Sequence, residues 1–530
     1  MLLLVAFALT VELLPNGGTE PGGGSRLPPS ATEVPAATAS GTIRSVPDAA
    51  VGGPAIASPS PLDAVRGTFG WMTVPGEVRL AALGASRVAF TDSIRAEALA
   101  ERAVTATVDP AKRFQTIDGF GAALTESSAV LLHGLPTAQR DAVLRSLFDP
   151  VAGAGLSLVR VPMGASDFAR THYTYDDLAS GQTDPGLERF SVVHDDATVI
   201  PVLREILAIN PQVRVVATPW SAPAWMKTTG SLRGGSLRPE YANVWARYFV
   251  RFVEAYAARG IPVAAVTVQN EPGHADESYP SMTMSVSEQI GFIADQLGPA
   301  FATAGLQTLI VGYDHNWDNA DFPMELLSDS AANRYVAGIA WHCYRGSPST
   351  QSQVQARFPD KGVWLSECSA GAWHSSASDG FGWLASILIG TVHDWARGAL
   401  LWNLALDPAG GPHLGGCADC RGILTITPGD SEPGSVTRSL EYDLLALASR
   451  AAPRGAVRVA VTVSADNLPV VGFVAPDGQR SLLVRNERNS EVVMTVNDGG
   501  PAFDVALPAK AVSAIRWSPS GGSLGDLQVR

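Results

Sequence analysis

The sequence predicts an α/β protein in which a (β/α)8 TIM barrel carries an attached β-sandwich domain. The first observation behind this prediction is that eight strand-like segments alternate with helix-like segments between residues 117 and 406. The second is that short alternating strands with hairpin-type turns follow residue 441. The third is that two glutamates directly follow apolar, β-branched-rich runs. Parallel barrels place their chemistry at such strand ends.

The first 62 residues are expected to lie outside both domains. The run Met1–Thr10 resembles the apolar part of a secretory signal, although no basic residue comes before Arg26. Glu12 ends this run well short of the ~20 apolar residues that a membrane span needs. From Pro15 to about Pro61 the chain is rich in Pro, Gly, Ser, Ala and Thr, which is typical of a disordered tether. We therefore expect a secreted or cell-surface protein without stable membrane insertion.

The catalytic barrel is expected over residues 114–440. Residues 63–113 precede it and contain β-type segments between Val88 and Val108, so they are expected to contribute strands to the β-sandwich. Amphipathic helices such as Pro136–Phe148 and Tyr241–Arg259 separate most of the barrel strands. The candidate barrel strands are Thr116–Gly119, Leu156–Pro162, Val213–Thr218, Val263–Gln269, Thr308–Tyr313, Val336–His342, Gly362–Ser366 and Ala399–Leu404.

The β-sandwich domain is expected over residues 441–530. Asp477-Gly478 and Asn497-Asp498-Gly499 supply hairpin-type turns between its strands. The candidate strands are Ala456–Val463, Pro469–Phe473, Ser481–Arg485, Val492–Val496 and Ala511–Trp517.

Composition limits the possible partners. With 46% hydrophobic and 17% charged residues, the chain can bury a large core and is not a disordered protein. Its net charge of −13 argues against nucleic acid, which requires clustered Lys and Arg, and against anionic membrane surfaces. A neutral carbohydrate or glycolipid remains compatible. The 12 tryptophans fit this class, because indole rings stack on sugar rings as well as packing in cores.

Four cysteines bear on metal and redox chemistry. Cys417 and Cys420 form a Cys-x-x-Cys pair in a glycine-rich loop, without the second pair or the nearby histidines that zinc would need. A disulfide that braces this loop and a pair of free thiols are both open. Cys368 follows Glu367 and is interpreted as a small buried side chain. We expect no metal and no cofactor.

Glu271 and Glu367 are the candidate catalytic residues. Glu271 lies in Val268-Gln269-Asn270-Glu271-Pro272, and Glu367 lies in Trp364-Leu365-Ser366-Glu367-Cys368. A single glutamate at a strand end is usually a solvated loop residue or a helix cap. Two such carboxylates at the mouth of one barrel, however, are the minimal set for glycoside hydrolysis. One gives a proton to the leaving oxygen, and the other attacks or activates water.

From about Phe114 to Trp517 the sequence resembles glycoside hydrolase family 30, the family of acid β-glucocerebrosidase (glucosylceramidase). The motifs come in the family's order along the barrel. They are Gln115–Glu126, Val159–Met163 with Ser166-Asp167-Phe168 and Tyr173-Thr174-Tyr175, Thr218–Lys227, Asn270-Glu271-Pro272, Ser366-Glu367 and Trp402–Leu406.

The resemblance implies a retaining mechanism. Glu271 would be the general acid and then the general base, with a pKa raised by a partly desolvated site and by the neighbouring carboxylate. Glu367 would be the ionised nucleophile that forms a covalent glycosyl-enzyme. Retention requires the two carboxyl groups to lie ~5–5.5 Å apart, whereas ~6.5–9.5 Å would admit water and invert the anomeric centre.

The resemblance also implies substrate-binding residues. Asn270 would hydrogen-bond the sugar 2-hydroxyl, and Tyr344 would donate to the nucleophile, although Tyr344 could instead be a partly buried aromatic. His274 and His315 flank the site and are interpreted as solvated loop histidines. Members that cleave glucosylceramide usually carry Asp where this chain has Glu126, so the hydroxyl contact is expected to shift. The sugar pocket would be built from Glu126, Trp220, Asp314, Trp402 and Asn403.

The expected function is therefore a retaining β-glycosidase that hydrolyses β-glucosyl linkages in the manner of a glucosylceramidase. An endo-β-1,6-glucanase or a β-xylosidase with the same catalytic pair is the alternative, because loops set the substrate on this fold. A non-catalytic carbohydrate-binding protein is disfavoured because both carboxylates and Asn270 are present. A metal-dependent hydrolase is disfavoured because no His-rich ligand set exists. The sequence leaves the aglycone, endo or exo action and the oligomeric state open.

Overall fold

The structure is a computed structural model that describes residues 69–83, 88–90, 103–429 and 434–519. The expected signal-like run and tether lie outside the described residues. All described residues belong to one compact unit, Pro47–Arg530. Within them, no helix is both long enough and apolar enough to span a bilayer.

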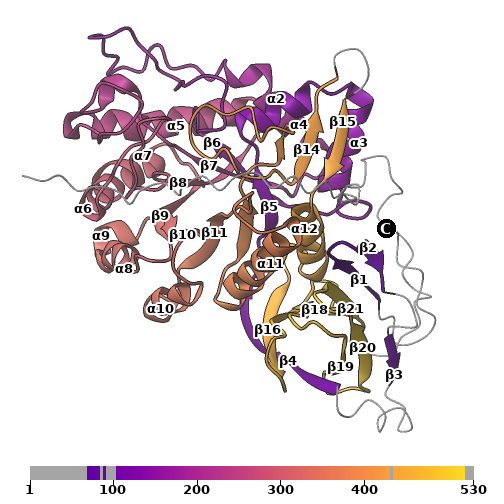
Figure 1. The fold of residues 1–530 in the computed structure, drawn as a ribbon. Helices are drawn as coiled ribbons and strands as arrows, with labels where there is room; N and C mark the ends of the chain where they lie inside the picture. Colours follow the sequence, from indigo (N-terminus) through magenta and orange to yellow (C-terminus); the bar gives the residue numbers. More distant parts are fainter. Residues whose placement is uncertain (1–68, 84–87, 91–102, 430–433, 520–530) are drawn as a thin grey trace, which may run out of the picture. The chain divides into compact units, whose positions relative to one another are not determined.

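Eight parallel strands close into a barrel in chain order, with the last strand pairing the first (Figure 1). This confirms the predicted (β/α)8 architecture. The sequence favours such strands because their β-branched and small apolar residues can be buried on both faces. The barrel strands are β5 (Gly119–Ala123), β6 (Leu158–Pro162), β7 (Arg214–Thr218), β8 (Val263–Thr267), β9 (Leu309–Asn316), β10 (Val336–His342), β11 (Gly362–Glu367) and β12 (Gly398–Leu401).

The predicted first barrel strand, Thr116–Gly119, is wrong. Thr116 is the last residue of β4 (Ala103–Thr116), which pairs with the sandwich strand β16, and the barrel begins at Gly119. The backbone of Gly119 has φ +134°, and a Cβ atom there would lie 1.7 Å from Ser157 Oγ. Only glycine allows this turn and close approach. The chain therefore leaves the sandwich and enters the barrel between Thr116 and Gly119.

Helices surround the barrel. The two helices expected from periodicity are confirmed within one residue, as α3 and α5. The helices are α2 (Glu126–His133), α3 (Thr137–Phe148), η2 (Asp195–Ala197), α4 (Val199–Ile209), η3 (Ala224–Met226), η4 (Pro239–Tyr241), α5 (Ala242–Ala258), α6 (Val286–Gly291), η5 (Phe292–Leu297), α7 (Gly298–Thr303), α8 (Asp321–Ser328), α9 (Ser330–Asn333), α10 (Ser349–Arg357), α11 (Ala377–His393) and α12 (Leu440–Ala451).

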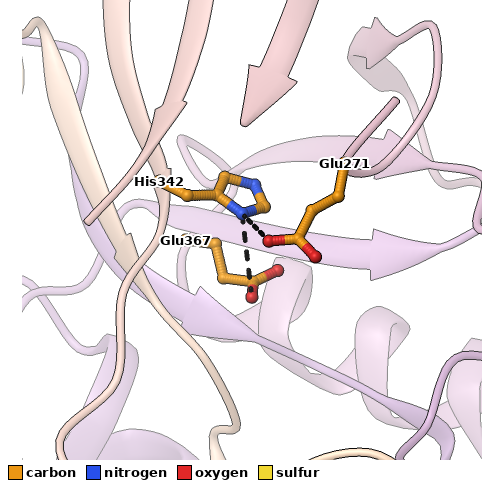
Figure 2. Close-up of side chains that lie close together, drawn as sticks. All are labelled: Glu271, His342 and Glu367. Atoms are coloured by element: carbon orange, nitrogen blue, oxygen red, sulfur yellow. Dashed lines mark hydrogen bonds and ion pairs between the residues drawn. The ribbon is translucent and has the colours of Figure 1, made fainter. Parts of the chain in front are cut away.

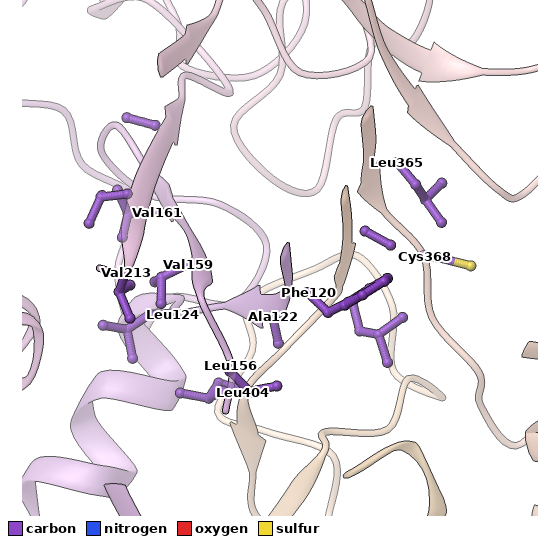
Figure 3. Close-up of a cluster of buried hydrophobic side chains, with 14 of the residues drawn as sticks. Phe120, Ala122, Leu124, Leu156, Val159, Val161, Val213, Leu365, Cys368 and Leu404 are labelled. Atoms are coloured by element: carbon purple, nitrogen blue, oxygen red, sulfur yellow. The ribbon is translucent and has the colours of Figure 1, made fainter. Parts of the chain in front are cut away.

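Apolar side chains fill the barrel and its junctions with the helices (Figure 3). Phe120, Val159 and Leu365, from β5, β6 and β11, are buried. Fully burying one such side chain stabilises the fold by about 1.5–3 kcal/mol. The packed interior leaves the strand ends as the place where polar groups can gather.

The second domain is a ten-stranded sheet in the order β2-β1-β21-β18-β17-β16-β4-β19-β20-β3. The described strands that precede the barrel belong to it. In β4, Val104, Ala106 and Val108 are buried, while Thr105 and Thr107 are exposed, the alternation of a half-buried strand. The remaining strands are β1 (Phe69–Val74), β2 (Val78–Ala82), β3 (Val88–Phe90), β16 (Val457–Val463), β17 (Val470–Val474), β18 (Arg480–Arg485), β19 (Val492–Asn497), β20 (Phe503–Leu507) and β21 (Val512–Trp517).

Helix α12 joins the two domains. It contacts β5 and α11 on the barrel side and β1, β18 and β21 of the ten-stranded sheet. Asp443 on α12 accepts hydrogen bonds from Arg79 and Thr73 of the sheet. A small sheet of β13 (Ala405–Leu406), β14 (Leu424–Thr427) and β15 (Ser435–Arg438) flanks the loop that follows β12.

Candidate active site

Glu271, His342 and Glu367 meet at the carboxyl end of the barrel (Figure 2). His342 and Glu367 are the last residues of β10 and β11, and Glu271 follows β8 by four residues. One oxygen of each glutamate and one nitrogen of His342 all lie within 4.8 Å of one another. The two carboxylates are therefore in the range of retaining rather than inverting glycosidases.

Glu271 is held in an uncommon backbone conformation, with φ +46°. Its N–H donates to the carbonyl of Asp314 at 3.0 Å, and its carbonyl accepts from His274 N at 2.8 Å. Asp314 and Asn403 also have positive φ. Such conformations cost free energy and gather at functional sites, where surrounding contacts hold them.

His342 sets the charge of Glu271. Its Nδ1 lies 3.1 Å from Glu271 Oε1. Burial alone raises the pKa of Glu271, but the hydrogen bond and positive charge of His342 bring that pKa below its usual range. The expectation of a raised pKa is thus wrong for the free site, because the sequence did not place a cation beside this acid.

The imidazole of His342 is buried among three carboxylates. Its Nε2 lies 3.1 Å from Asp314 Oδ1, and its Nδ1 lies 3.9 Å from Glu367 Oε1. Burial lowers the pKa of His342, but the charge of Glu367 and the hydrogen bonds to Asp314 and Glu271 raise it to about 10. At neutral pH one proton is therefore shared by His342 and Glu271. The pair loses this proton as one unit, so its pKa describes the two residues together.

Replacing His342 with glutamine is expected to move the alkaline limb of the kcat/KM profile to lower pH by at least about one unit. In the native site the pair retains its proton up to the raised pKa of His342, about 10. In the variant Glu271 alone must carry the proton, from an ordinary pKa of 4.5 that burial raises. The measurement is aryl β-glucoside hydrolysis across pH, with exposed His393→Gln as the control; an unmoved limb would contradict the shared proton.

Glu367 is oriented by two donors. Arg160 Nη1 donates to Oε2, and Tyr344 O–H donates to Oε1 at 2.9 Å. The side chain is 8% exposed. Hydrogen bonds to both oxygens fix the direction of the carboxylate. Burial and the charge of Glu367 raise the pKa of Tyr344, so Tyr344 remains a donor.

Arg160 is a central residue that the sequence analysis did not assign. Besides Glu367, it donates to Asn270 Oδ1 at 2.8 Å and to Asp314 Oδ2 at 3.0 Å. Burial lowers its pKa, but the charges of Asp314 and Glu367 raise it above its usual value. The signal was present in the sequence, because Arg160 interrupts the otherwise apolar strand Leu158–Pro162.

Asp314 lies against His342 and Arg160, the two cations that contact the catalytic pair. It is fully buried. Oδ1 accepts from Ser366 and faces His342, while Oδ2 accepts from Thr267 and Arg160. Both oxygens are therefore occupied by protein groups. This differs from the expected contact with a sugar hydroxyl and makes Asp314 a support for Arg160 and His342.

The expected aromatic residues lie together. Trp220 and Trp402 stack with ring centroids 5.2 Å apart, and the guanidinium of Arg160 lies over both rings. Asn403 accepts a hydrogen bond from Thr125, while its buried Nδ2 has no hydrogen-bond partner among the described residues. A buried donor without a partner is costly unless a ligand satisfies it.

Glu126 is bound by Arg170 and His194. Its Oε2 accepts from Arg170 N at 2.8 Å, and its Oε1 accepts from the Arg170 guanidinium and lies 3.3 Å from His194 Nε2. Burial raises the pKa of Glu126, but these contacts lower it below the usual value. The carboxylate of Glu126 is thus bound to a half-exposed arginine.

Two disulfides lie near the site. Cys417 and Cys420 are joined in the loop after β12. Cys343 and Cys368 are joined as well, so the interpretation of Cys368 as a simple buried side chain is incomplete. Spacing alone could not reveal this bond, because the two residues meet only when β10 and β11 pair.

Glu271, His342 and Glu367 are also the one group of His, Cys, Asp and Glu side chains in the described ranges that is close enough to hold a metal ion. Both ring nitrogens of His342 already face carboxylates, and Arg160 lies against Glu367. A metal would have to displace these cations. The charge arrangement therefore fits proton transfer better than metal binding.

Known proteins resemble this chain over both domains. The model of the glycosyl hydrolase family 30 TIM-barrel domain matches residues 117–427, and that of the glycosyl hydrolase family 30 beta sandwich domain matches residues 455–515. The endo-1,6-beta-D-glucanase of Neurospora crassa is 34% identical over 409 residues, which cover 74% of this chain and 83% of that protein. The lysosomal acid glucosylceramidase of Mus musculus is 30% identical over 440 residues, which cover 78% of this chain and 83% of that protein. The solved structure of the endo-beta1,6-glucanase BT3312 superposes with a TM-score of 0.77 and 32% identity, covering 85% of this chain and 99% of that one.

Proposed function

Because the chain belongs to glycosyl hydrolase family 30 and is a glycoside hydrolase, we propose that it is a secreted, retaining endo-β-1,6-glucanase. The observation that carries the mechanism is the approach of the Glu271 and Glu367 oxygens within 4.8 Å of each other. The relatives named above support the substrate, and they favour the β-1,6-glucanase alternative over a glucosylceramidase-like enzyme.

In the first step a carboxylate oxygen of Glu367 attacks the anomeric carbon while the bond to the glycosidic oxygen breaks. The leaving oxygen takes its proton from Glu271. The shared proton of the His342–Glu271 pair supplies this acid, since a shift from His342 to Glu271 leaves the pair's total charge unchanged. The product of this step is a glycosyl ester on Glu367.

In the second step Glu271 accepts a proton from water, and the resulting hydroxyl attacks the anomeric carbon and releases Glu367. Esterification removes the negative charge of Glu367, which is the first cause of the raised pKa of His342. The pair has by then given its shared proton to the leaving oxygen, and the loss of the Glu367 charge lowers the affinity of His342 for a new proton. Glu271 therefore enters the second step as a carboxylate that can accept the proton of the attacking water.

Substrate-binding roles follow from the free donors around the pair. Because Arg160 occupies Asn270 Oδ1, the amide N–H groups of Asn270 are the donors that would meet the sugar 2-hydroxyl. The buried Nδ2 of Asn403 would meet a second hydroxyl. Trp220 and Trp402 would provide apolar ring surface for the sugar.

Glu126 supports a substrate other than glucosylceramide. Its buried carboxylate is held by Arg170 and His194, so the acid that the resemblance assigns to a sugar hydroxyl is already engaged by protein groups. These contacts would change the hydroxyl contacts of the sugar, and the Arg170 guanidinium that makes them is half-exposed. Such a guanidinium fits a substrate that continues beyond the sugar in the pocket.

Secretion is supported by the signal-like run at the N-terminus and by the two disulfides of the described residues. Disulfides persist in oxidising compartments.

A panel of substrates tests the proposed specificity. Linear β-1,6-glucan is expected to give a mixture of oligosaccharides early in the reaction, with the β anomer formed first by NMR. Glucosylceramide in micelles, β-1,4-xylan and aryl β-xyloside are expected to react at least about a hundredfold more slowly. Faster cleavage of glucosylceramide, or release of glucose alone from the polymer, would contradict the proposal.

A further inference from the structure

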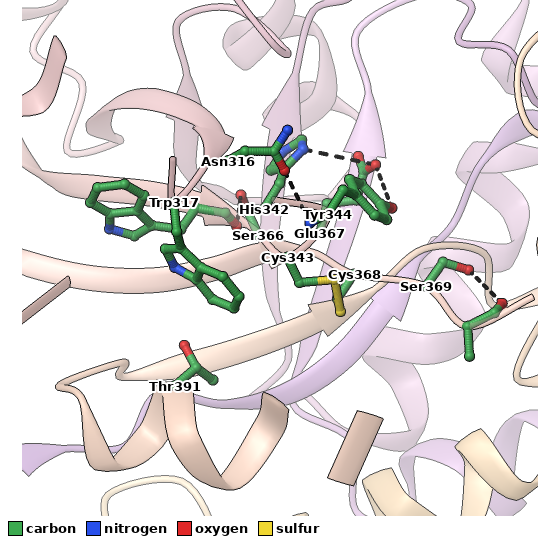
Figure 4. Close-up of a disulfide and its surroundings, with 12 residues drawn as sticks. Asn316, Trp317, His342, Cys343, Tyr344, Ser366, Glu367, Cys368, Ser369 and Thr391 are labelled. Atoms are coloured by element: carbon green, nitrogen blue, oxygen red, sulfur yellow. Dashed lines mark hydrogen bonds and ion pairs between the residues drawn. A yellow bond between two sulfur atoms is a disulfide. The ribbon is translucent and has the colours of Figure 1, made fainter. Parts of the chain in front are cut away.

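The disulfide Cys343–Cys368 joins the residues that directly follow His342 and Glu367 (Figure 4). It therefore ties the carboxyl ends of β10 and β11 together at the catalytic groups. Both cysteines are buried, with 5% and 0% exposure. The proposed mechanism assigns no task to this bond.

Backbone pairing weakens at this point of the barrel. From Gly338 to Trp341, β10 pairs with β11 in a regular register, but the register then shifts so that His342 faces Glu367. On its other side β11 pairs with β12 through Leu365 and Ala399, and two further backbone bonds run from Arg397 N to Val363 O and from Trp402 N to Cys368 O. The ladder alone thus leaves the end of β11 sparsely fixed, and the covalent bond begins where the regular ladder ends.

The same bond fixes the tyrosine that holds the nucleophile. Tyr344 follows Cys343, its N–H donates to Asn316 Oδ1 at 3.0 Å, and its O–H donates to Glu367 Oε1 at 2.9 Å. Glu367 in turn precedes Cys368. The disulfide, the two strand ends and the Tyr344–Glu367 hydrogen bond therefore close a ring that sets the position of one nucleophile oxygen.

We propose that Cys343–Cys368 is a positioning device that keeps Glu367 aligned on Tyr344 for attack. This inference rests on the proposed role of Glu367 as the nucleophile. A shift of about 1 Å in an attacking atom can lower a rate about a hundredfold, so a bond at this place acts on kcat rather than on substrate binding.

The test is the variant Cys343→Ala/Cys368→Ala, examined alone and combined with Tyr344→Phe. The disulfide variant is expected to lower kcat on an aryl β-glucoside about 10- to 100-fold, with KM within about threefold. Tyr344→Phe is expected to lower kcat clearly less in the disulfide variant than in the wild-type protein, because both changes remove the same alignment. A merely structural bond would lower thermal stability and leave the effect of Tyr344→Phe unaltered.

The matched control is Cys417→Ala/Cys420→Ala, which removes the other disulfide from a loop that contacts neither Tyr344 nor Glu367 through a hydrogen bond in the described residues. This control is expected to change KM for the polymer. Its effect on kcat is expected to be fully additive with the effect of Tyr344→Phe. A folded Cys343→Ala/Cys368→Ala variant with native kcat, or with full additivity, would overturn the positioning role. Glu367→Ala separates the two proposals, because its activity tests the nucleophile whatever the disulfide does.

Native reduction keeps the proposal testable should the double variant not fold. The wild-type protein is incubated with a phosphine reductant, and cysteine alkylation is mapped by mass spectrometry as activity is followed. Activity is expected to fall with the appearance of alkylated Cys343 and Cys368 and to return on reoxidation. Full activity in protein whose Cys343–Cys368 bond is open would overturn the inference.

Discussion

Replacing Glu367 with alanine is expected to lower kcat on an aryl β-glucoside by at least about four orders of magnitude. The variant removes the carboxylate that Arg160 and Tyr344 direct toward the anomeric carbon. Asp314 cannot replace it, because Asp314 is fully buried and its oxygens are occupied by hydrogen-bond partners. Initial rates and thermal unfolding measured together separate loss of chemistry from loss of fold.

Azide provides the sharper readout for this variant. The missing side chain leaves room beside the anomeric carbon, so azide is expected to restore part of the activity and to give the α-glucosyl azide, with inverted configuration. Glu254→Ala, an exposed change on α5, is the control and is expected to behave as wild type. Near-native turnover in Glu367→Ala would remove the nucleophile assignment.

Replacing Glu271 with glutamine is expected to have an effect that depends on the leaving group. A dinitrophenolate needs no proton, so its burst in the glycosylation step should be slowed less than about tenfold. For β-1,6-glucan and alkyl β-glucosides, which need the proton, kcat/KM should fall about 10²–10⁴-fold. The amide keeps the size of the side chain but cannot transfer a proton. Stopped-flow bursts and steady-state rates on both substrate types check this.

Azide distinguishes this variant from the previous one. It should speed the breakdown of the accumulated glycosyl-enzyme and give the β-glucosyl azide, with retained configuration. Equal losses on good and poor leaving groups would contradict the role of Glu271 as the acid.

The sequence was sufficient to predict the architecture and the catalytic candidates. Buried strand runs followed by Glu271 and Glu367 required both carboxylates to lie at the same end of a barrel, and the structure brings them together. The same logic could have found His342, which ends β10, and Arg160, whose charge interrupts β6. Both carry positive charge into the site, and without them the direction of the Glu271 pKa shift could not be predicted.

Other features depend on tertiary contacts that local patterns do not encode. On sequence alone, residues 116–119 are a candidate barrel strand because of their place before the first βα alternation, but pairing with β16 assigns Thr116 to the sandwich. The Cys343–Cys368 bond joins positions 25 residues apart that meet only through the shifted register of β10 and β11. Likewise, the contact of Glu126 with Arg170 and His194 depends on the fold of the loop after β6.

The central claim is that Glu367 becomes covalently bonded to the sugar during turnover. The most direct measurement uses 2-deoxy-2-fluoro-β-glucosyl fluoride to trap that intermediate, followed by proteolysis and mass spectrometry of the peptides. The account predicts one fluoroglucosyl group per molecule, on the peptide that contains Glu367. An adduct on any other residue would contradict it, and so would complete inactivation without an adduct.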